Sequence, residues 1–493
     1  MTRCWVAVVS LALACGCGGG DGAGAGAGAT GGTSNSGGTG ASGGSAGGSD
    51  AGGSGAGGSG AGAGSAGTGS AGAAGAGGQT AEETLASSVS YYDGLIEFQF
   101  AQEYVVGRFV NGDYWVHNHG GDVVITAITP TAVGAPGGAE RVMNGTMLNP
   151  ANSTTQGYDS SARDMGFDAN LNVDPAFTGQ DLVVSPSSSV IKGISTASSD
   201  GRPILADAAV LTVLSATPLK DAFRPPYVGQ RSVVATAAEL DYSQLGTHAR
   251  LGGEPDIDSV ASRYERVWLE HCTSWVSRDI HPANHMPAYG RDLARSSAEG
   301  LVMLQLDYSD AEKQRLLVGL VQYGIDIYGI AAAGGAWDAN GGHNLGRKMP
   351  LLLAGQVLHH PQMLEYADAA QHFIFQDDQQ HFYVSQAEVD MSHSAAWAPD
   401  DRAVATPYEV SDIGLPEWGI RHFDKPQADN KNWGATYRNV NGPSQVMQVF
   451  AARLMGVESA WNWPALFDYA DRYYQTESGV GPDWFQALWG AYR

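Results

Sequence analysis

Cysteine is scarce in this chain of 493 residues, which contains only four. Cys4, Cys15 and Cys17 lie close to the N-terminus, so Cys272 is the only cysteine in the rest of the sequence. One cysteine cannot build an internal disulfide framework, which excludes the class of small, disulfide-stapled secreted domains. The simplest interpretation of Cys272 is a small buried hydrophobic residue rather than a catalytic thiol.

Basic residues are also scarce, with 27 Lys and Arg against 51 Asp and Glu and a formal net charge of −24. Phosphate backbones repel such an acidic chain, so nucleic acid is excluded as a partner. A long apolar run is missing as well, because Gln322 and Asp326 interrupt the most apolar stretch, residues 316–330. We therefore expect no membrane-spanning helix in the body of the protein.

Low complexity separates the N-terminal residues from the rest of the chain. Residues 18–80 consist almost entirely of Gly, Ala, Ser and Thr. This composition buries too little apolar surface to offset the entropy of ordering the chain, so we expect a disordered tether. Residues 1–17 differ, because Arg3 precedes an apolar core that is too short to span a bilayer. This pattern predicts an export signal.

A lipid-attachment signal is suggested by the segment Leu11-Ala12-Leu13-Ala14-Cys15-Gly16-Cys17, which resembles the lipobox of bacterial lipoproteins. The resemblance implies that Cys15 or Cys17 carries the lipid and becomes the mature N-terminus. We therefore expect membrane contact only through this anchor, on the outer membrane or the cell surface. Plain secretion is the alternative.

Residues 81–235 have the pattern of short β-strands. The tight turn Asn111-Gly112-Asp113 separates two apolar runs and predicts a hairpin. Strands of this length, with Gly, Pro, Asn and Ser between them, favour an antiparallel β-sandwich. At the start of this region, residues 84–104 are predicted to form an amphipathic helix instead. The loop 143–179 is long enough to fold over a neighbouring surface. Further strands are predicted over residues 122–129, 181–184, 190–194 and 208–214.

Residues 236–493 have the periodicity of α-helices. Ser309 and Glu312 fit a capping pair at the start of one of them. Helices of similar length with alternately short and long connections predict an incomplete (α/α) toroid, so the expected fold class is α+β with two domains. The predicted helices cover residues 259–275, 292–306, 310–333, 345–358, 363–375, 444–454, 464–474 and 483–492.

One loop between two of these helices, residues 337–350, is unusually rich in functional groups. It holds an aromatic ring, a carboxylate, two amides, an imidazole, a guanidinium and an ammonium, together with glycines. Glycine lets a backbone turn sharply and approach a ligand, and polar loops between rigid helices often carry function. The alternative is a capped turn in which His343 and Asn344 satisfy backbone groups.

Other loops of the helical part contain the same residue types. In a toroid, alternate loops meet at one rim, where Trp and Tyr would stack on sugar rings and Arg and amides would bind carboxylates. The expected ligand is therefore a long, hydroxylated, acidic polymer. The candidate substrate-binding residues are Asn284, His285, Tyr289, Arg291, Trp337, Arg347, Lys348, Trp397, Trp418, Arg421, His422 and Trp433.

This plan, with Asn–His pairs and a downstream Tyr and Arg, resembles the helical-barrel polysaccharide lyases, of which alginate lyases are examples. The resemblance implies β-elimination of a uronic-acid-containing polysaccharide without a cofactor. By that resemblance His343 or Asn344 would engage the carboxylate, Tyr437 would be base or acid, and Arg438 would hold charge with Arg421. The order of the two parts is reversed relative to common family members. We expect a monomer.

Two other functions stay open. An inverting glycoside hydrolase needs two carboxyl groups about 6.5–9.5 Å apart. A glycan-binding lipoprotein would keep the aromatic cleft without chemistry. Histidines with nearby carboxylates offer metal ligands, but no spacing such as His-Glu-x-x-His occurs, so we expect no catalytic metal. The candidate hydrolase carboxylates are Asp338, Asp400, Asp401, Glu409 and Glu417, and the candidate metal-binding histidines are His343, His393 and His422.

Overall fold

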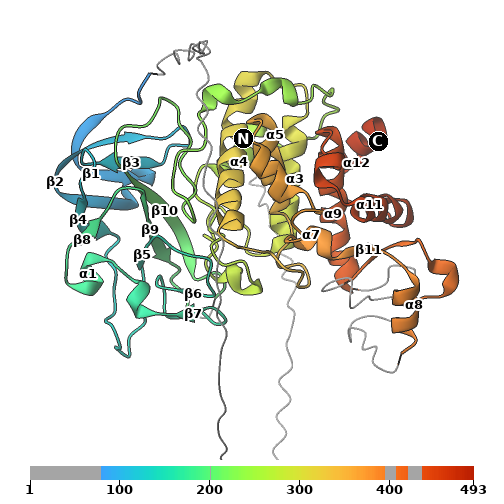
Figure 1. The fold of residues 1–493 in the computed structure, drawn as a ribbon, viewed down its shortest axis with the longest axis horizontal. Helices are drawn as coiled ribbons and strands as arrows, with labels where there is room; N and C mark the ends of the chain where they lie inside the picture. Colours follow the sequence, from blue (N-terminus) through green and yellow to red (C-terminus); the bar gives the residue numbers. More distant parts are fainter. Residues whose placement is uncertain (1–78, 200, 395–406, 420–435) are drawn as a thin grey trace, which may run out of the picture. The chain divides into compact units, whose positions relative to one another are not determined.

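The computed structural model describes residues 79–199, 201–394, 407–419 and 436–493, drawn in colour in Figure 1. The expected export signal with Cys15 and Cys17, and the expected tether up to residue 78, lie outside these ranges. A β-rich part comes first in the described chain and a helical part follows, which confirms the α+β class. Both parts belong to one compact unit, and the boundary expected near residue 235 stays a prediction.

One sheet dominates the β-rich part, and its strands follow the order β5-β9-β10-β3-β2-β4-β8, with β1 paired to β2 beside this path. Neighbouring strands are antiparallel except for β10 and β3. The predicted hairpin is confirmed, because β2 and β3 flank the turn at Gly112. The strands are β1 (Thr84–Tyr91), β2 (Ile96–Arg108), β3 (Tyr114–His117), β4 (Val123–Thr129), β5 (Thr146–Leu148), β8 (Leu182–Val184), β9 (Ser188–Ser195) and β10 (Leu205–Leu214).

At β10 both faces of the sheet are buried. Along β10, Ala208 and Val210 pack in the large core that includes the helices, whereas Ala209 and Leu211 pack in a second core. This second core contains residues of β1, β2, β3, β4, β8, β9 and β10, so the sheet curls around its own apolar side chains. Because side chains alternate across a strand, β10 separates the two cores.

The helix expected over residues 84–104 is wrong, because this segment forms β1 and most of β2. Ile96, Phe98 and Phe100 are buried at every second position, which is the period of a strand rather than of a helix. Leu85 and Leu95, which completed the helical pattern, are exposed instead. The alternation of three large apolar residues was therefore the stronger signal.

The helical part contains most of the predicted helices, together with several shorter ones. Ser309 and Glu312 form the predicted capping box at the start of α4. The principal helices are α3 (Gly290–Leu304), α4 (Asp310–Ala332), α5 (Lys348–Val357), α6 (Pro361–Ala367), α9 (Thr436–Leu454), α11 (Pro464–Thr476) and α12 (Asp483–Tyr492). The shorter elements are α1 (Pro175–Thr178), α2 (Ile257–Ala261), α7 (Gln376–Gln379), α8 (Gln386–Ser392), α10 (Glu458–Trp461), and the small strands β6 (Thr155–Gln156), β7 (Gly166–Phe167), β11 (His381–Tyr383) and β12 (Pro416–Trp418).

Two predicted helices are too long. The helix expected over residues 259–275 ends within α2 and a following 3-10 turn, and residues 267–272 run non-helically through the core. All residues from 267 to 272 are buried, including Glu270 and His271, so burial in this segment shows no period that could separate helix from strand. Cys272 lies in this segment and is buried, as predicted. The helix expected over residues 363–375 ends with α6.

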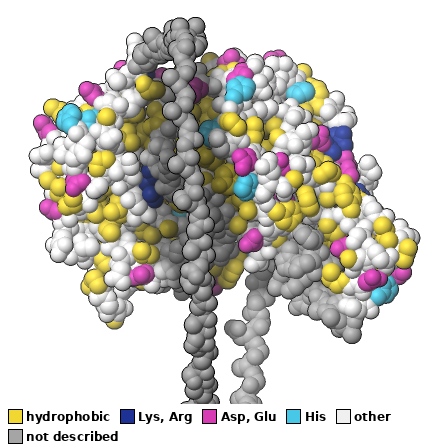
Figure 2. Space-filling model, viewed as in Figure 1, with side chains coloured by type: hydrophobic (Ala, Val, Ile, Leu, Met, Phe, Trp, Pro, Cys, Tyr) yellow, Lys and Arg dark blue, Asp and Glu magenta, His cyan; other side chains and the backbone are white. Residues whose placement is uncertain are grey.

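The large core joins the helices to the sheet, and α4 lies within it. By length and composition α4 is apolar enough to cross a membrane, but 83% of its most apolar window is buried inside the protein, as in a core helix. On the face shown in Figure 2, acidic side chains are scattered and Lys or Arg side chains are confined to a few places. A cluster of arginines therefore marks a place that attracts anions more strongly than the rest of this surface.

Candidate functional site

The loop between α4 and α5 is held rigidly by amide side chains. The carbonyl oxygen of Gly341 accepts hydrogen bonds from Gln376 Nε2 at 2.9 Å and from Gln380 Nε2 at 2.8 Å. Oε1 of Gln376 accepts from the backbone N–H groups of Asn340 and Asn344, both at 3.0 Å. These bonds fix the position of the residues around His343.

Two glycines allow this loop to approach α3 and α9 closely. A Cβ atom at Gly342 would lie 2.3 Å from Oδ1 of Asn441 and 2.8 Å from the hydroxyl of Tyr289. Gly346 has a φ of +93°, and a Cβ atom there would lie 2.4 Å from the backbone nitrogen of Ala294. Only glycine fits these two positions, so the glycines of the sequence pattern position the loop.

Gly346→Ala is expected to lower the free energy of unfolding by about 1–3 kcal/mol more than a matched glycine substitution. The matched control is Gly334→Ala, because Gly334 has a φ of +87° and an added Cβ meets nothing within 4 Å. Both variants carry the same backbone strain, so their difference in urea unfolding isolates the clash with Ala294. If both variants lose the same free energy of unfolding, the loop moves away from Ala294 without a loss of stability.

His343 is half-buried beside two aromatic rings. Its ring centroid lies 4.8 Å from that of Tyr289 and 6.0 Å from that of Trp275, both in edge-on arrangements. Burial, with the nearby cations Arg278 and Arg347, lowers the pKa of His343 to about 4. Nδ1 is buried without a hydrogen-bond partner among the described residues, which leaves Nε2 as the nitrogen open to a ligand. At neutral pH the imidazole is therefore uncharged and able to accept a proton.

Arginines surround the two rings that contact His343. The guanidinium carbons of Arg202 and Arg278 each lie 5.9 Å from the ring centroid of Trp275, which is 37% exposed. The guanidinium carbon of Arg291 lies 5.4 Å from the ring centroid of Tyr289. In a protein with a net charge of −24, this arrangement gives a local attraction for anions.

The arginines beside Trp275 and Tyr289 differ in how much of their charge is neutralised by acidic partners. Arg202 forms ion pairs with Asp164 and, at 3.4 Å, with Asp279. Arg291 is paired with Asp292 at 2.8 Å. Arg278 is half-buried and forms no ion pair within the described part of the chain, where its Nε is also without a hydrogen-bond partner. Arg278 is thus the cation best able to bind a ligand carboxylate.

Residues distant in sequence build this cluster. The buried carboxylate of Asp279 accepts hydrogen bonds from the backbone N–H groups of Asp164 at 3.2 Å and Met165 at 3.1 Å. Burial raises the pKa of Asp279, against these hydrogen bonds and the nearby Arg278 and Arg163. The long loop 143–179 is thereby tied to the 3-10 helix Trp275–Asp279. We name Trp275, Arg278, Tyr289, Arg291 and His343 the His343 cluster.

Sequence reasoning missed Trp275, Arg278 and Arg202 as candidate site residues. Trp275 was assigned to the end of a predicted helix, and Arg202 lies in the connection between β9 and β10. The available signal was the pair of an aromatic and an arginine three residues apart, which places both on one side of a helical turn. Of the predicted substrate-binding residues, Tyr289 and Arg291 do lie beside His343.

Three predicted site residues of the loop are turned into the core. Asn344 is 2% exposed, and its Nδ2 donates to the backbone oxygen of Asp338 at 2.7 Å. Arg347 pairs with Glu270 at 3.0 Å, and Lys348 pairs with Asp378 at 2.8 Å, with all four side chains fully buried. A fully buried side chain does not touch a polymer, so we revise these assignments from substrate contact to positioning.

Two tryptophans and an arginine are likewise buried. Trp337 is stacked on Phe375 with ring centroids 5.4 Å apart. Trp418 lies in β12 within the large core, and Arg438 pairs with Glu417 at 3.1 Å, both side chains being fully buried. Because these three side chains are buried, the contacts with substrate that the sequence predicts for them do not form in this structure.

Asn284 and His285, the second predicted pair, lie at the carboxylate of Asp207. Nδ2 of Asn284 donates to Oδ2 at 2.6 Å, and Nδ1 of His285 lies 3.4 Å from Oδ1. Nε2 of His285 lies 3.0 Å from the carbonyl oxygen of Val267. His285 therefore fastens the loop before α3 to β10, whereas Asn284 is exposed.

Several other candidates lie outside the described residues, namely Trp397, Asp400, Asp401, Arg421, His422, Trp433 and the side chain of Tyr437. Among the hydrolase candidates that are described, Asp338 and Glu409 are exposed, and Glu417 is enclosed by Arg438, Arg472 and the Tyr408 hydroxyl. Within the described residues no group of three or more His, Cys, Asp and Glu side chains is placed to hold a metal ion.

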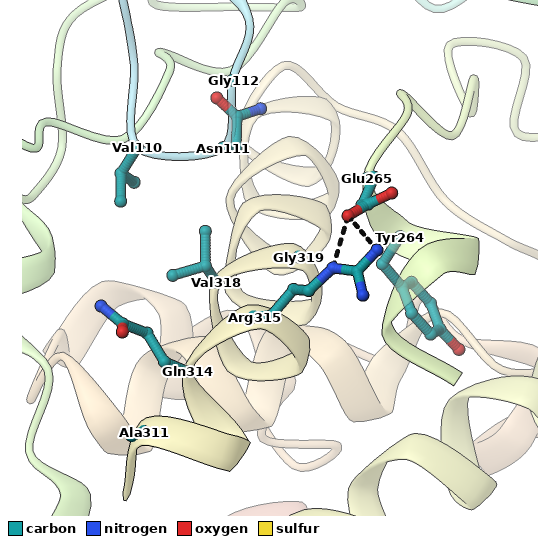
Figure 3. Close-up of a pocket in the computed structure, with 10 residues that line it drawn as sticks. All are labelled: Val110, Asn111, Gly112, Tyr264, Glu265, Ala311, Gln314, Arg315, Val318 and Gly319. Atoms are coloured by element: carbon teal, nitrogen blue, oxygen red, sulfur yellow. Dashed lines mark hydrogen bonds and ion pairs between the residues drawn. The ribbon is translucent and has the colours of Figure 1, made fainter. Parts of the chain in front are cut away.

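A separate pocket of about 350 Å³ lies between the β2–β3 turn and α4 (Figure 3). Its cation, Arg315, is neutralised by Glu265 at 2.5 Å and by Asp258 at 3.2 Å. The remaining lining includes Val110 and Val318. This pocket has no spare positive charge for an acidic ligand, so the His343 cluster is the stronger candidate site.

Comparison with known proteins gives no family to which the chain can be assigned: no protein-family model, no curated protein and no solved structure matches it.

Proposed function

We propose that the protein cleaves a uronic-acid-containing polysaccharide by β-elimination at the His343 cluster. The observation that carries this proposal is one juxtaposition. An uncharged, half-buried imidazole lies beside a tyrosine ring and an arginine that has no ion pair among the described residues. A base, a proton donor and a carboxylate-binding cation are the three groups that elimination next to a carboxylate requires.

Each group has a defined role in this mechanism. Arg278 binds the uronate carboxylate and makes the proton on the adjacent carbon, C5, more acidic. Nε2 of His343 takes that proton, and the electron pair left behind forms the C4=C5 double bond. The bond from C4 to the glycosidic oxygen breaks, and the Tyr289 hydroxyl gives its proton to the departing oxygen. Tyr437, the base or acid that the family resemblance implies, is the alternative donor.

The remaining features of the cluster serve binding. The exposed ring of Trp275 offers a face for stacking on a sugar, and the cations over it favour an acidic polymer over a neutral one. Arg347 lies beneath His343 and donates to its carbonyl oxygen at 2.9 Å, which holds the imidazole in place. A glycan-binding protein without catalysis would use the same surface, so the test must detect the product.

The proposal includes the finer expectations about fold and location. The helices form an incomplete (α/α) toroid and the curled sheet a sandwich-like domain. The protein acts as an exported monomer, anchored through lipid on Cys15 or Cys17 or else secreted. Support comes from the export-type N-terminal sequence and from the acidic, low-cysteine composition of the body.

The decisive experiment mixes the purified protein with uronate polymers and follows ultraviolet absorbance of a conjugated alkene. Elimination creates an unsaturated uronate at the new non-reducing end, so absorbance rises as chains shorten. A hydrolase releases reducing ends without this absorbance, and a binding protein retards the polymer in a gel but leaves it intact. Either of these two results would replace the proposed function.

The pH dependence of the elimination is expected to follow the lowered pKa of His343. A histidine base with its ordinary pKa would lose most activity below pH about 6.5, whereas here kcat/KM should hold until the pH approaches the value of about 4. Arg278 is one cause of the lowering, so Arg278→Gln should raise the pKa and move the acidic limb to higher pH. The measurement is kcat/KM from pH 4 to 8 for both proteins. An unchanged limb in the variant would exclude His343 as the base.

A further inference from the structure

A second depression lies beside the His343 cluster, between the loop 283–287 and the first turns of α3. It has a volume of about 450 Å³, within the range of about 300–1,000 Å³ typical of ligand sites. Asp292, Arg295 and Glu299 come from one face of α3, and Asn284, Met286 and Pro287 come from the loop. We name this depression the α3 pocket.

The two carboxylates that line the α3 pocket are each paired with an arginine. Glu299 is neutralised by Arg263 at 3.0 Å, and Asp292 by Arg291 at 2.8 Å. Arg295 is exposed and forms no ion pair within the described residues. The guanidinium of Arg295 is therefore the only cation lining this pocket that is left, in the described chain, to bind a carboxylate through two parallel hydrogen bonds.

The other residues that line the α3 pocket suit a sugar ring. Nδ2 of Asn284 is already donated to Asp207, so its carbonyl oxygen is the part left to accept a hydrogen bond from a sugar hydroxyl. Pro287 supplies apolar surface for the C–H face of a ring. Apolar contact with a few placed polar groups is the usual composition of a small-ligand site.

The α3 pocket adjoins the His343 cluster through a single ion pair. Asp292 lines the pocket, and its partner Arg291 lies over the ring of Tyr289, which contacts His343. Residues 292, 295 and 299 recur at helical spacing, so Arg295 follows Asp292 along the same face of α3. Arg295 therefore lies about one helical turn from Asp292, the ion-pair partner of Arg291.

We propose that the α3 pocket is a second subsite, which binds a further carboxylated sugar unit of the polymer with its carboxylate on Arg295. This inference rests on the proposed function for the identity of the polymer. It specifies an acidic chain of several units as the substrate rather than a single acidic sugar.

The test measures binding of size-defined oligouronates, a dimer and a hexamer, to the full protein by calorimetry. Arg295→Gln is expected to weaken hexamer binding about tenfold or more, because hydrogen bonds to a charged group contribute at least about one factor of ten. Dimer binding is expected to stay unchanged. Arg250→Gln is the matched control, since Arg250 stacks on Tyr308 beyond the other end of α3. A carboxyl-reduced hexamer should bind the wild type and Arg295→Gln equally.

The outcomes separate this inference from the proposed function. If the wild type forms unsaturated product but Arg295→Gln binds the hexamer like the wild type, the subsite is wrong and the function stands. If Arg295→Gln loses hexamer affinity but the wild type forms no unsaturated product, the subsite stands and the lyase proposal fails. If the wild type does not bind the acidic hexamer, both are overturned.

Discussion

His343→Gln is expected to lower the rate of unsaturated-product formation by about 10²–10⁴-fold, the contribution of one positioned acid–base group. The carboxamide keeps a polar side chain of similar reach but cannot take the proton from the sugar. Binding of the polymer should change little, because Arg278 and the aromatic faces are untouched, so the loss should appear in kcat. The measurement is initial-rate absorbance over a range of polymer concentrations.

Folding should be unaffected by this change, which separates a catalytic from a structural role. Nδ1 of His343 has no hydrogen-bond partner among the described residues, so its replacement leaves no partner of this nitrogen unsatisfied. His119→Gln is the matched control, because His119 is exposed in the turn after β3. Both variants should melt within a few degrees of the wild type. Full activity of His343→Gln would move the catalytic centre elsewhere, and Tyr437→Phe, expected from sequence to be equally damaging, would then be the next test.

The sequence predicted those turns and helix ends that depend only on residues close together in the chain. The turn at Gly112 needs a positive φ, and the capping box of Ser309 and Glu312 needs only residues three apart, so both could be recognised. The segment 84–104 shows the limit of such reasoning. Exposed Leu85 and Leu95 completed a helical period by chance, while the alternation around Phe98 carried the true signal.

Only part of the candidate site could be predicted, because the type of a residue shows its chemistry but not whether its side chain points to solvent or into the core. The sequence shows that functional groups gather in the loop around His343, but not which of them face solvent. Arg347 and Lys348 looked like substrate cations, yet their acidic partners lie 77 and 30 residues away in the sequence, at Glu270 and Asp378. No local pattern reports such pairs.

Arg278 and Arg202, the two cations beside Trp275, were missed for a related reason. Arg278 lies three residues beyond the helix predicted over residues 259–275, so no predicted element placed its side chain. Arg202 reaches Trp275 only because the sheet packs against the helical part. Tertiary packing, rather than local propensity, brings these two side chains to His343.

Arg347→Met is expected to lower the free energy of unfolding by about 3–5 kcal/mol, the cost of leaving one partner of a buried ion pair without the other. Glu270 is fully buried, and burial already raises its pKa against the opposing effect of Arg347. Without the guanidinium the carboxylate must either stay charged in the core or take up a proton. The measurement is urea unfolding followed by tryptophan fluorescence, with Arg315→Met as the control. Arg315 forms a half-exposed pair with Glu265, so its loss should cost no more than about 1 kcal/mol.

The double variant Arg347→Met/Glu270→Gln distinguishes a structural cation from a substrate-binding one. Removing both charges leaves no isolated ion in the core, so the double variant should recover much of the stability that Arg347→Met loses. A cation that bound substrate would behave differently: the single variant would raise KM with little effect on unfolding, and the second substitution would rescue nothing. Arg347 also lowers the pKa of His343, so in both variants the acidic limb of kcat/KM should move to higher pH. A loss of stability together with this shift would place Arg347 beneath the site as the support of its base.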